Sequence, residues 1–520
     1  MVVGGCVRKS KRRDVLIFGR SGDAKTFDPA RANDGETFYA TTQVYDTLVQ
    51  FKYGTVELEP ALATSWRIEK GGLEVIFSLR RGVEFHRTKY FPGAEFSAKD
   101  VVFSFKRQMD PKHPYHRIGG RSFSYWMSMG MNRIVKDVVA LDRYRVKFIL
   151  HKRDATFLSN LAMNFASILS KDYADMLLRE GRGEEIAQKP VGTGPFIFDR
   201  WIKGDRIVYR ANEKYWGGAP KFKWLVLKTI PDQTARAVAL RAGEIDIMDF
   251  PAPEEVPSLE RDPNIKIVRQ EGLNVGYMAM NMEKKPFDDV RVRRAIYHAI
   301  NKKAIVRAVF GDLGVVAVNP LPPTVWGYHR GIRDYEYNPE LAKKLLKEAG
   351  YPEGFETDLW AMPIQRPYMP NARKLAEAVQ ADLAKVGVRV KIVQYDWATY
   401  QQKLEQGEHG MALLGWTGDN GDPDNFLYVL LSSTAAEKPA TNIAFFRNKE
   451  FDRLLEEAKV ISDRKKRASL YRRAQEIFHR EVPWVPLAHS VVVVPMNKRV
   501  EGFRIDPVGS RRFHKVYLRR

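Results

Sequence analysis

The stretch NPELAKKLLKEAG, from Asn338 to Gly350, restricts the fold more than any other part of the chain because it carries a complete set of helix signals. Asn338 suits the N-cap, where its side chain can accept from a backbone N–H, and Pro339 suits the first helical position. Gly350 follows the last turn, where a left-handed residue commonly ends a helix. The stretch therefore predicts an amphipathic helix.

A second helix, followed by a strand, is predicted immediately downstream. In NARKLAEAVQADLAKVG, Leu375, Val379 and Leu383 lie along one stripe at helical spacing, and Gly387 closes the pattern. Apolar residues then alternate with polar ones over 388–392, which is typical of a strand. A helix that feeds a strand predicts α/β layering.

Strand signals dominate the first half of the chain. Residues 14–20, DVLIFGR, predict a short strand, and the Gly, Asp and Pro residues of 27–37 predict a loop at the edge of a site. Residues 73–79, LEVIFSL, alternate with the two-residue period of a half-buried strand, and 143–151 repeat that pattern. At 520 residues, the chain exceeds one core, so we expect a division into domains.

Composition excludes several classes of protein. The net charge of +22 would suit nucleic acid, but the basic residues are spread over the whole length, and no nucleic-acid-binding motif is present. No apolar run approaches the roughly 18 residues that span a membrane. The single cysteine, Cys6, excludes an internal disulfide framework. It follows VGG as a lipidated cysteine would, but only five residues precede it, so a lipid anchor and an ordinary free cysteine both stay open.

The acidic stretch GDNGDPDN, 418–425, is the strongest candidate for chemistry. It fails the EF-hand pattern, because glycine and proline stand where that calcium loop needs oxygen ligands. Tight turns explain part of it. They do not explain the flanking Trp416 and Phe426, nor the apolar run that leads in, which predicts a buried strand delivering a loop to a site. HPYH, 113–116, lacks a third metal ligand, and we find no signature of a hydrolase or a nucleotide-binding loop.

Several long stretches occur together in a consistent order. They are FSAKDVVFSFKRQMDPKHPYH (96–116), VGTGPF (191–196), DDVRVRRAIYHAINK (288–302), LWAMPIQRPYMPNARKLAE (359–377) and GWTGDNGDPDNF (415–426). In these stretches the chain resembles family 5 of the bacterial extracellular solute-binding proteins, in particular the dipeptide binders of ATP-driven importers. The resemblance runs from about Asp14 to near Arg520.

The resemblance implies a periplasmic-binding-protein-like fold of type II, in the large peptide-binding cluster, with two hinged α/β lobes that enclose the ligand. The implied division is a basic leader or anchor linker at 1–13, lobe I at 14–272 and 490–520 with an extra subdomain within about 46–190, and lobe II at 273–489. It also implies that Asp419 pairs with the α-ammonium of a dipeptide and that Arg366 takes its α-carboxylate. Two fixed counter-charges would offset the several kcal/mol that burying either end unpaired costs.

Further contacts are implied by family position. Trp416, Tyr368 and Trp397 would line side-chain pockets, although each also fits an ordinary core aromatic, and Gly415 would lie beside them. From the first lobe, Asn33 and Gly35 would meet the peptide backbone, while the intervening Asp34 departs from the family's pattern by adding a charge.

The resulting hypothesis is a monomeric binding protein, without catalytic residues, metal or cofactor. It would serve the transmembrane subunits of an ABC importer at the periplasmic or extracellular face of the membrane. Membrane contact would come only through the importer or an anchor at Cys6. Haem, glutathione or longer peptides are alternative ligands, and a peptide hydrolase using Asp419 with Asp422 is the alternative from another class.

Overall fold

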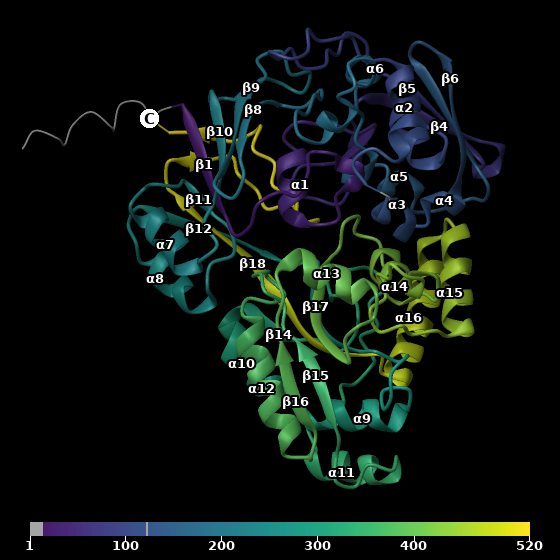
Figure 1. Ribbon diagram of the computed structural model, residues 1–520, viewed down its shortest axis with the longest axis vertical. Helices are drawn as coiled ribbons and strands as arrows, with labels where there is room; N and C mark the ends of the chain where they lie inside the picture. Colours follow the sequence, from purple (N-terminus) through teal and green to yellow (C-terminus); the bar gives the residue numbers. More distant parts are fainter. Residues whose placement is uncertain (1–13, 121–122, 520) are drawn as a thin grey trace, which may run out of the picture. The chain divides into compact units, whose positions relative to one another are not determined.

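The computed structural model describes residues 14–120 and 123–519, which form two compact units (Figure 1). Unit 1 comprises the chain up to Arg153, Phe157–Arg269 and Val493–Arg520; unit 2 comprises Asp154–Thr156 and Gln270–Val492. The short insertion of 154–156 into unit 2 carried no signal in the sequence. Cys6 and the basic leader lie outside the described residues.

Unit 1 contains two larger sheets. In one, β1 is parallel to both β10 and β11, and β9 is antiparallel to β10 and to β8. The other is antiparallel, in the order β4-β5-β7-β6. The strands are β1 (Val15–Arg20), β2 (Val49–Phe51), β3 (Leu58–Pro60), β4 (Ala63–Glu69), β5 (Glu74–Leu79), β6 (Val135–Asp142), β7 (Arg145–Leu150), β8 (Phe196–Ile202), β9 (Arg206–Ala211), β10 (Trp224–Thr229), β11 (Ile247–Met248), β19 (Val500–Glu501) and β20 (Tyr517–Leu518), and β12 (Ile265–Glu271) runs from unit 1 into unit 2. The helices are α1 (Gly35–Thr41), α2 (Ala98–Met109), α3 (Ser124–Ser128), α4 (Met131–Ile134), α5 (Phe157–Asn160), α6 (Lys171–Arg179), α7 (Gln233–Arg241) and α8 (Val256–Glu260).

The strand predicted at 73–79 is confirmed over 74–79, but its predicted alternation of buried and exposed residues is wrong at the first two. Leu73 stays 39% exposed in the turn before β5, whereas Glu74 is buried. The Glu74 carboxylate accepts hydrogen bonds from Lys70 Nζ at 2.7 Å and Lys147 Nζ at 3.4 Å. The alternating pattern alone predicted that Glu74 faces solvent. Its two lysine partners allow the carboxylate to be buried instead.

Unit 2 is built on a mixed sheet in the order β16-β15-β17-β13-β18. The strands are β13 (Asn274–Met280), β14 (Gly314–Val316), β15 (Glu356–Trp360), β16 (Arg389–Val393) and β17 (Met411–Thr417), and β18 (Trp484–Asn497) runs from unit 2 into unit 1. The helices are α9 (Val290–Ala299), α10 (Lys302–Phe310), α11 (Pro339–Glu348), α12 (Ala372–Ala384), α13 (Trp397–Glu405), α14 (Asp424–Leu431), α15 (Lys449–Val460) and α16 (Arg464–Glu481). β15 is parallel to both of its neighbours. α12 lies beside β16, and α10 lies beside β14 and α12 (Figure 1).

The helix and strand predictions of 338–392 are confirmed. α11 begins at Pro339 with the Asn338 side chain accepting from the Leu341 N–H at 2.9 Å, and Gly350 follows its end with a φ of 91°. α12 and β16 occupy the next two predicted positions, which produces the expected helix-to-strand layering. Among the described helices, none is long and apolar enough to cross a bilayer.

A buried histidine makes the stability of unit 2 depend on pH. Burial lowers the pKa of His409 to about 4, and its Nε2 lies 2.8 Å from the Ile443 carbonyl oxygen. Because the unfolded chain takes up this proton near pH 6.5, the stability due to neutral His409 is lost as the pH falls from about 6.5 towards 4. We expect His409→Gln to reduce the loss of unfolding free energy between pH 7 and pH 5 by about 2 kcal/mol, measured by denaturant titration. An unchanged difference between the two pH values would contradict this role.

Candidate functional site

Two loops of unit 2 leave the same edge of its sheet. β15 and β17 are parallel neighbours, with Trp360 paired to Ala412. The loop after β15 carries Arg366 and Tyr368, and the loop after β17 carries Asp419. Because the carboxyl ends of parallel strands open at one edge, residues more than fifty positions apart in sequence come together there.

Tyr368 is the residue on which the two predicted charges converge. Burial raises the pKa of Tyr368; Arg366 opposes that rise through its charge and a side-chain hydrogen bond, and the charge of Asp419 adds to it. Arg366 and Tyr368 are each 8% exposed. The Arg366 backbone is fixed by reciprocal hydrogen bonds with Met369, of 3.1 and 2.9 Å, and its Nη1 donates to the Gln365 carbonyl oxygen at 2.8 Å. The structure thus brings a cation, an anion and a phenol to one place.

Gly415 has a steric role at this place. A Cβ there would lie 2.2 Å from Cδ2 of the Tyr368 ring and 2.6 Å from the Val275 carbonyl oxygen. Both distances are far inside van der Waals contact, so a larger residue would displace the ring. The missing side chain of Gly415 therefore leaves room for the Tyr368 ring to pack directly against β17.

Trp416 and Asp419 share one hydrogen-bond acceptor that the sequence did not suggest. Asn425, which is fully buried near the start of α14, accepts from the Trp416 indole N–H at 2.9 Å and from the Asp419 backbone N–H at 2.8 Å. Trp416 and Asp419 are themselves only partly buried. In the sequence, the only indication of a role for Asn425 was its position at the end of the acidic stretch 418–425.

The second aspartate of the loop forms a buried ion pair. Asp422 accepts two hydrogen bonds from Arg467 of α16, at 2.8 and 2.9 Å, in the paired geometry that a planar guanidinium favours. The Asp422 side chain also accepts from the Asp424 backbone N–H at 3.0 Å. Its role is to hold the turn against α16.

The third aspartate meets a buried lysine. Lys459, near the end of α15, lies 3.2 Å from Asp424 and 3.8 Å from Asp154, and all three side chains are almost completely buried. Burial raises the pKa of Asp424 to about 7, and Lys459 opposes that rise. Two of the three loop aspartates are therefore neutralised by cations within unit 2.

Trp397 is placed by the start of α13. Its ring stacks on Tyr400 with centroids 5.9 Å apart and planes at 19°. The Tyr400 hydroxyl donates to the Leu413 carbonyl oxygen of β17 at 2.7 Å, and its oxygen lies 3.1 Å from the Trp360 carbonyl oxygen of β15. Trp397 stays partly exposed, so its ring is supported from one side by the same two strands that carry the loops.

The two predicted residues of unit 1, Asn33 and Gly35, lie at the start of α1. The loop predicted over 27–37 is wrong at its end, because α1 begins at Gly35 with Asp34 as its N-cap. The Asp34 carboxylate accepts from the Thr37 N–H at 3.2 Å and lies 3.6 Å from Lys25 Nζ. The negative charge of Asp34 therefore faces Lys25 within unit 1. A Cβ on Gly35 would meet nothing nearer than the Tyr39 ring at 3.9 Å, so packing does not require glycine there.

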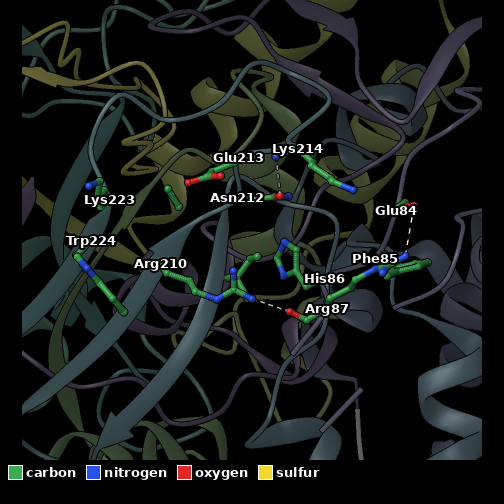
Figure 2. A pocket seen from close by; sticks show the side chains of 12 residues that line it. Glu84, Phe85, His86, Arg87, Arg210, Asn212, Glu213, Lys214, Lys223 and Trp224 are labelled. Atoms are coloured by element: carbon green, nitrogen blue, oxygen red, sulfur yellow. Dashed lines mark hydrogen bonds and ion pairs between the residues drawn. The ribbon is translucent and has the colours of Figure 1, made fainter. Parts of the chain in front are cut away.

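A cavity of about 430 Å³ lies elsewhere in unit 1 (Figure 2). Its lining comes from β8, β9, β10 and residues next to them and from the segment 84–87, and includes none of the predicted site residues. The cations there serve local contacts: Arg210 donates to the Arg87 carbonyl oxygen at 2.7 Å, and Lys223 lies 3.4 Å from Asp14. Among the described residues, no group of three His, Cys, Asp or Glu side chains could hold a metal ion.

Known proteins resemble this chain over almost its whole length. The family described as "Bacterial extracellular solute-binding proteins, family 5 Middle" matches residues 57–438. Heme-binding protein A of Haemophilus influenzae is 45% identical, with 98% of this chain and 93% of that protein covered. The dipeptide-binding protein of Escherichia coli is 43% identical, with coverage of 99% and 97%.

A solved structure matches the fold closely. It is the ABC transporter-associated periplasmic binding protein DppA of Helicobacter pylori in complex with the peptide STSA, with 47% identity and a TM-score of 0.94, covering 97% of this chain and 98% of that one. The match confirms the predicted two-lobed α/β class of periplasmic binding proteins. The chain belongs to family 5 of the bacterial extracellular solute-binding proteins.

Proposed function

We propose that this protein captures dipeptides through their two charged ends and delivers them to the transmembrane subunits of an ATP-driven importer, outside the cytoplasmic membrane. The observation that carries the proposal is the convergence of Arg366 and Asp419 on Tyr368 at one edge of the sheet of unit 2. The family supports the extracellular or periplasmic location and the role in transport.

The chemistry of the two residues suits the two ends of a peptide. Arg366 can donate two parallel hydrogen bonds to the α-carboxylate, and the Asp419 carboxylate can accept from the α-ammonium. Each such charge-assisted bond contributes roughly 1.5 to 3 kcal/mol. An extended peptide lengthens by about 3.3 to 3.6 Å per residue, which exceeds what a hydrogen bond can stretch. Two counter-charges at a fixed separation therefore select peptides of one length.

The aromatic residues suit loose recognition of side chains. Trp416 lies in β17, Tyr368 lies on the loop after β15, and Trp397 begins the helix after β16. Their ring faces can contact a ligand side chain without demanding one particular kind. In unit 1, Gly35 leaves its backbone open to a close approach by a peptide, and Asn33 keeps an amide able to donate or accept.

The paired charges favour a peptide over haem as the ligand. Haem carries two carboxylates and no ammonium group, so Asp419 would face like charge rather than a partner. The haem-binding name of one relative and the peptide STSA bound to the Helicobacter protein make ligand class and length the quantities to measure.

A calorimetric titration with Gly-Leu, N-acetyl-Gly-Leu, Gly-Gly-Leu and haem tests the proposal. We expect Gly-Leu to bind at least about tenfold more tightly than its N-acetyl form, because acetylation removes the charge that Asp419 pairs with. The tripeptide should bind more weakly as well, and haem should show no shift of its Soret band. Equal affinity for all three peptides, or tight binding of haem alone, would overturn the proposal.

The proposed role includes no catalysis. In the part of the chain that the structure describes, no group of three His, Cys, Asp or Glu side chains could hold a metal ion. Asp422 is held by Arg467, so the pair of aspartates considered for a hydrolase has one member already neutralised. After incubation with the protein, Gly-Leu should be recovered intact by mass spectrometry. Release of free glycine and leucine in step with protein concentration would instead show a hydrolase.

A further inference from the structure

We propose that Asn425 is a positioning residue that sets the preference of this site for a free α-ammonium group. It acts through Asp419, so the inference rests on the function proposed above. Its side-chain oxygen accepts both the Asp419 backbone N–H and the Trp416 indole N–H, at 2.8 and 2.9 Å. One atom thereby fixes the residue proposed to meet the ammonium and the aromatic wall beside it.

Asn425 can do this because it is itself rigidly held. All eight residues of α14 are buried, and the Asn425 backbone N–H donates to the Asp422 carbonyl oxygen at 3.1 Å. Asp422 is in turn fixed by two hydrogen bonds from Arg467. The ion pair therefore anchors the helix start, and the helix start presents the acceptor to the loop.

The two donors lie on either side of the end of β17. Trp416 belongs to β17, whereas Asp419 lies beyond Gly418, whose own N–H donates to the Leu273 carbonyl oxygen at 2.7 Å. A carbonyl oxygen has two lone pairs, so a single asparagine can accept both bonds. Without that oxygen, the last residues of β17 and the start of the loop lose their common point of attachment.

The effect on specificity follows from the steep geometry of hydrogen bonds. A charge-assisted N–H···O bond is confined to about 2.7 to 2.9 Å, so a small shift of the Asp419 backbone removes much of its attraction for an ammonium group. A ligand without that group has little to lose from the shift. Removal of Asn425 should therefore weaken free dipeptides selectively, which a merely structural residue would not do.

The test compares Asn425→Ala with Asn442→Ala, since Asn442 is an equally buried asparagine of unit 2 whose amide donates to the Ser432 and Phe446 carbonyl oxygens. Calorimetry with Gly-Leu and N-acetyl-Gly-Leu should show about tenfold weaker Gly-Leu binding for Asn425→Ala and little change for the acetylated peptide. Asn442→Ala should leave the ratio of the two affinities as in the unmodified protein. In an Asp419→Asn background, adding Asn425→Ala should cost little further affinity, since both changes act through one contact.

A second variant keeps the test decisive if Asn425→Ala fails to fold. Asn425→Asp retains an acceptor oxygen at the same position and should preserve the preference for Gly-Leu over its acetylated form. The proposal is wrong if both peptides weaken equally in Asn425→Ala, if its effect adds fully to that of Asp419→Asn, or if Asn425→Asp loses the preference for Gly-Leu over its acetylated form. These outcomes are separate from a failure of the proposed function, which would already show as a lack of preference for Gly-Leu in the unmodified protein.

Discussion

Asp419→Asn is expected to weaken Gly-Leu binding at least about tenfold, because the amide keeps the shape of the side chain but removes the charge that we propose meets the ligand's ammonium group. Arg366→Ala is expected to weaken binding at least as much, since the α-carboxylate would then be desolvated without a counter-charge. Calorimetric titration of each variant with Gly-Leu measures the effect.

Two exposed residues of unit 2 provide matched controls. Asp312→Asn and Arg333→Ala make the same chemical changes outside the site, and both should keep the affinity of the unmodified protein. Thermal unfolding should show that all four variants are folded. If neither Asp419→Asn nor Arg366→Ala changes the affinity for Gly-Leu, the proposed pairing of charges is refuted.

The second large effect concerns stability rather than binding. Lys459→Met is expected to lower the free energy of unfolding by about 3 to 5 kcal/mol, because it leaves Asp424 and Asp154 buried without their counter-charge. Methionine retains most of the apolar volume, so the loss reports mainly on charge. Denaturant titrations at pH 7.5 and at a higher pH measure it, because without Lys459 the pKa of Asp424 rises further and proton uptake at pH 7.5 offsets part of the loss.

A rescue experiment identifies the cause of that loss. In Lys459→Met/Asp424→Asn, the carboxylate with the closer contact to Lys459 is replaced by a neutral amide, and a substantial part of the stability should return. If the double variant is as unstable as the sum of the two single variants, lost packing around Lys459 rather than uncompensated charge is responsible.

Local sequence signals were sufficient to predict elements whose ends are set by residues close together in the chain. The N-cap at Asn338, the proline after it and the glycine at 350 act within one or two turns, so they predicted α11 before any packing was known. The same local logic failed at Glu74. Lys70 lies within the same short window, but Lys147, the second partner of the Glu74 carboxylate, lies 73 residues away and is brought there only by the pairing of β5 with β7.

In the candidate site, too, some features were indicated by the sequence and others were shown only by the structure. The acidic composition of the loop after β17 was visible in the sequence, and resemblance to a family suggested Asp419 and Arg366. Neither could show that Asp422 and Asp424 are neutralised by Arg467 and Lys459. Those partners lie on helices that follow the loop by tens of residues, and only packing brings them beneath it.

The sequence by itself determined the α/β class, the two helices and the strand of 338–392, and an acidic turn delivered by an apolar strand. The tertiary structure alone decided which of these acids are paired with buried cations. It brought the loops of two parallel strands to one edge and buried two aspartates against cations. It also tied Asp419 and Trp416 to Asn425. The physical reason is that the energy of a buried charge depends on its partners in space, whereas a sequence pattern reports only on neighbours along the chain.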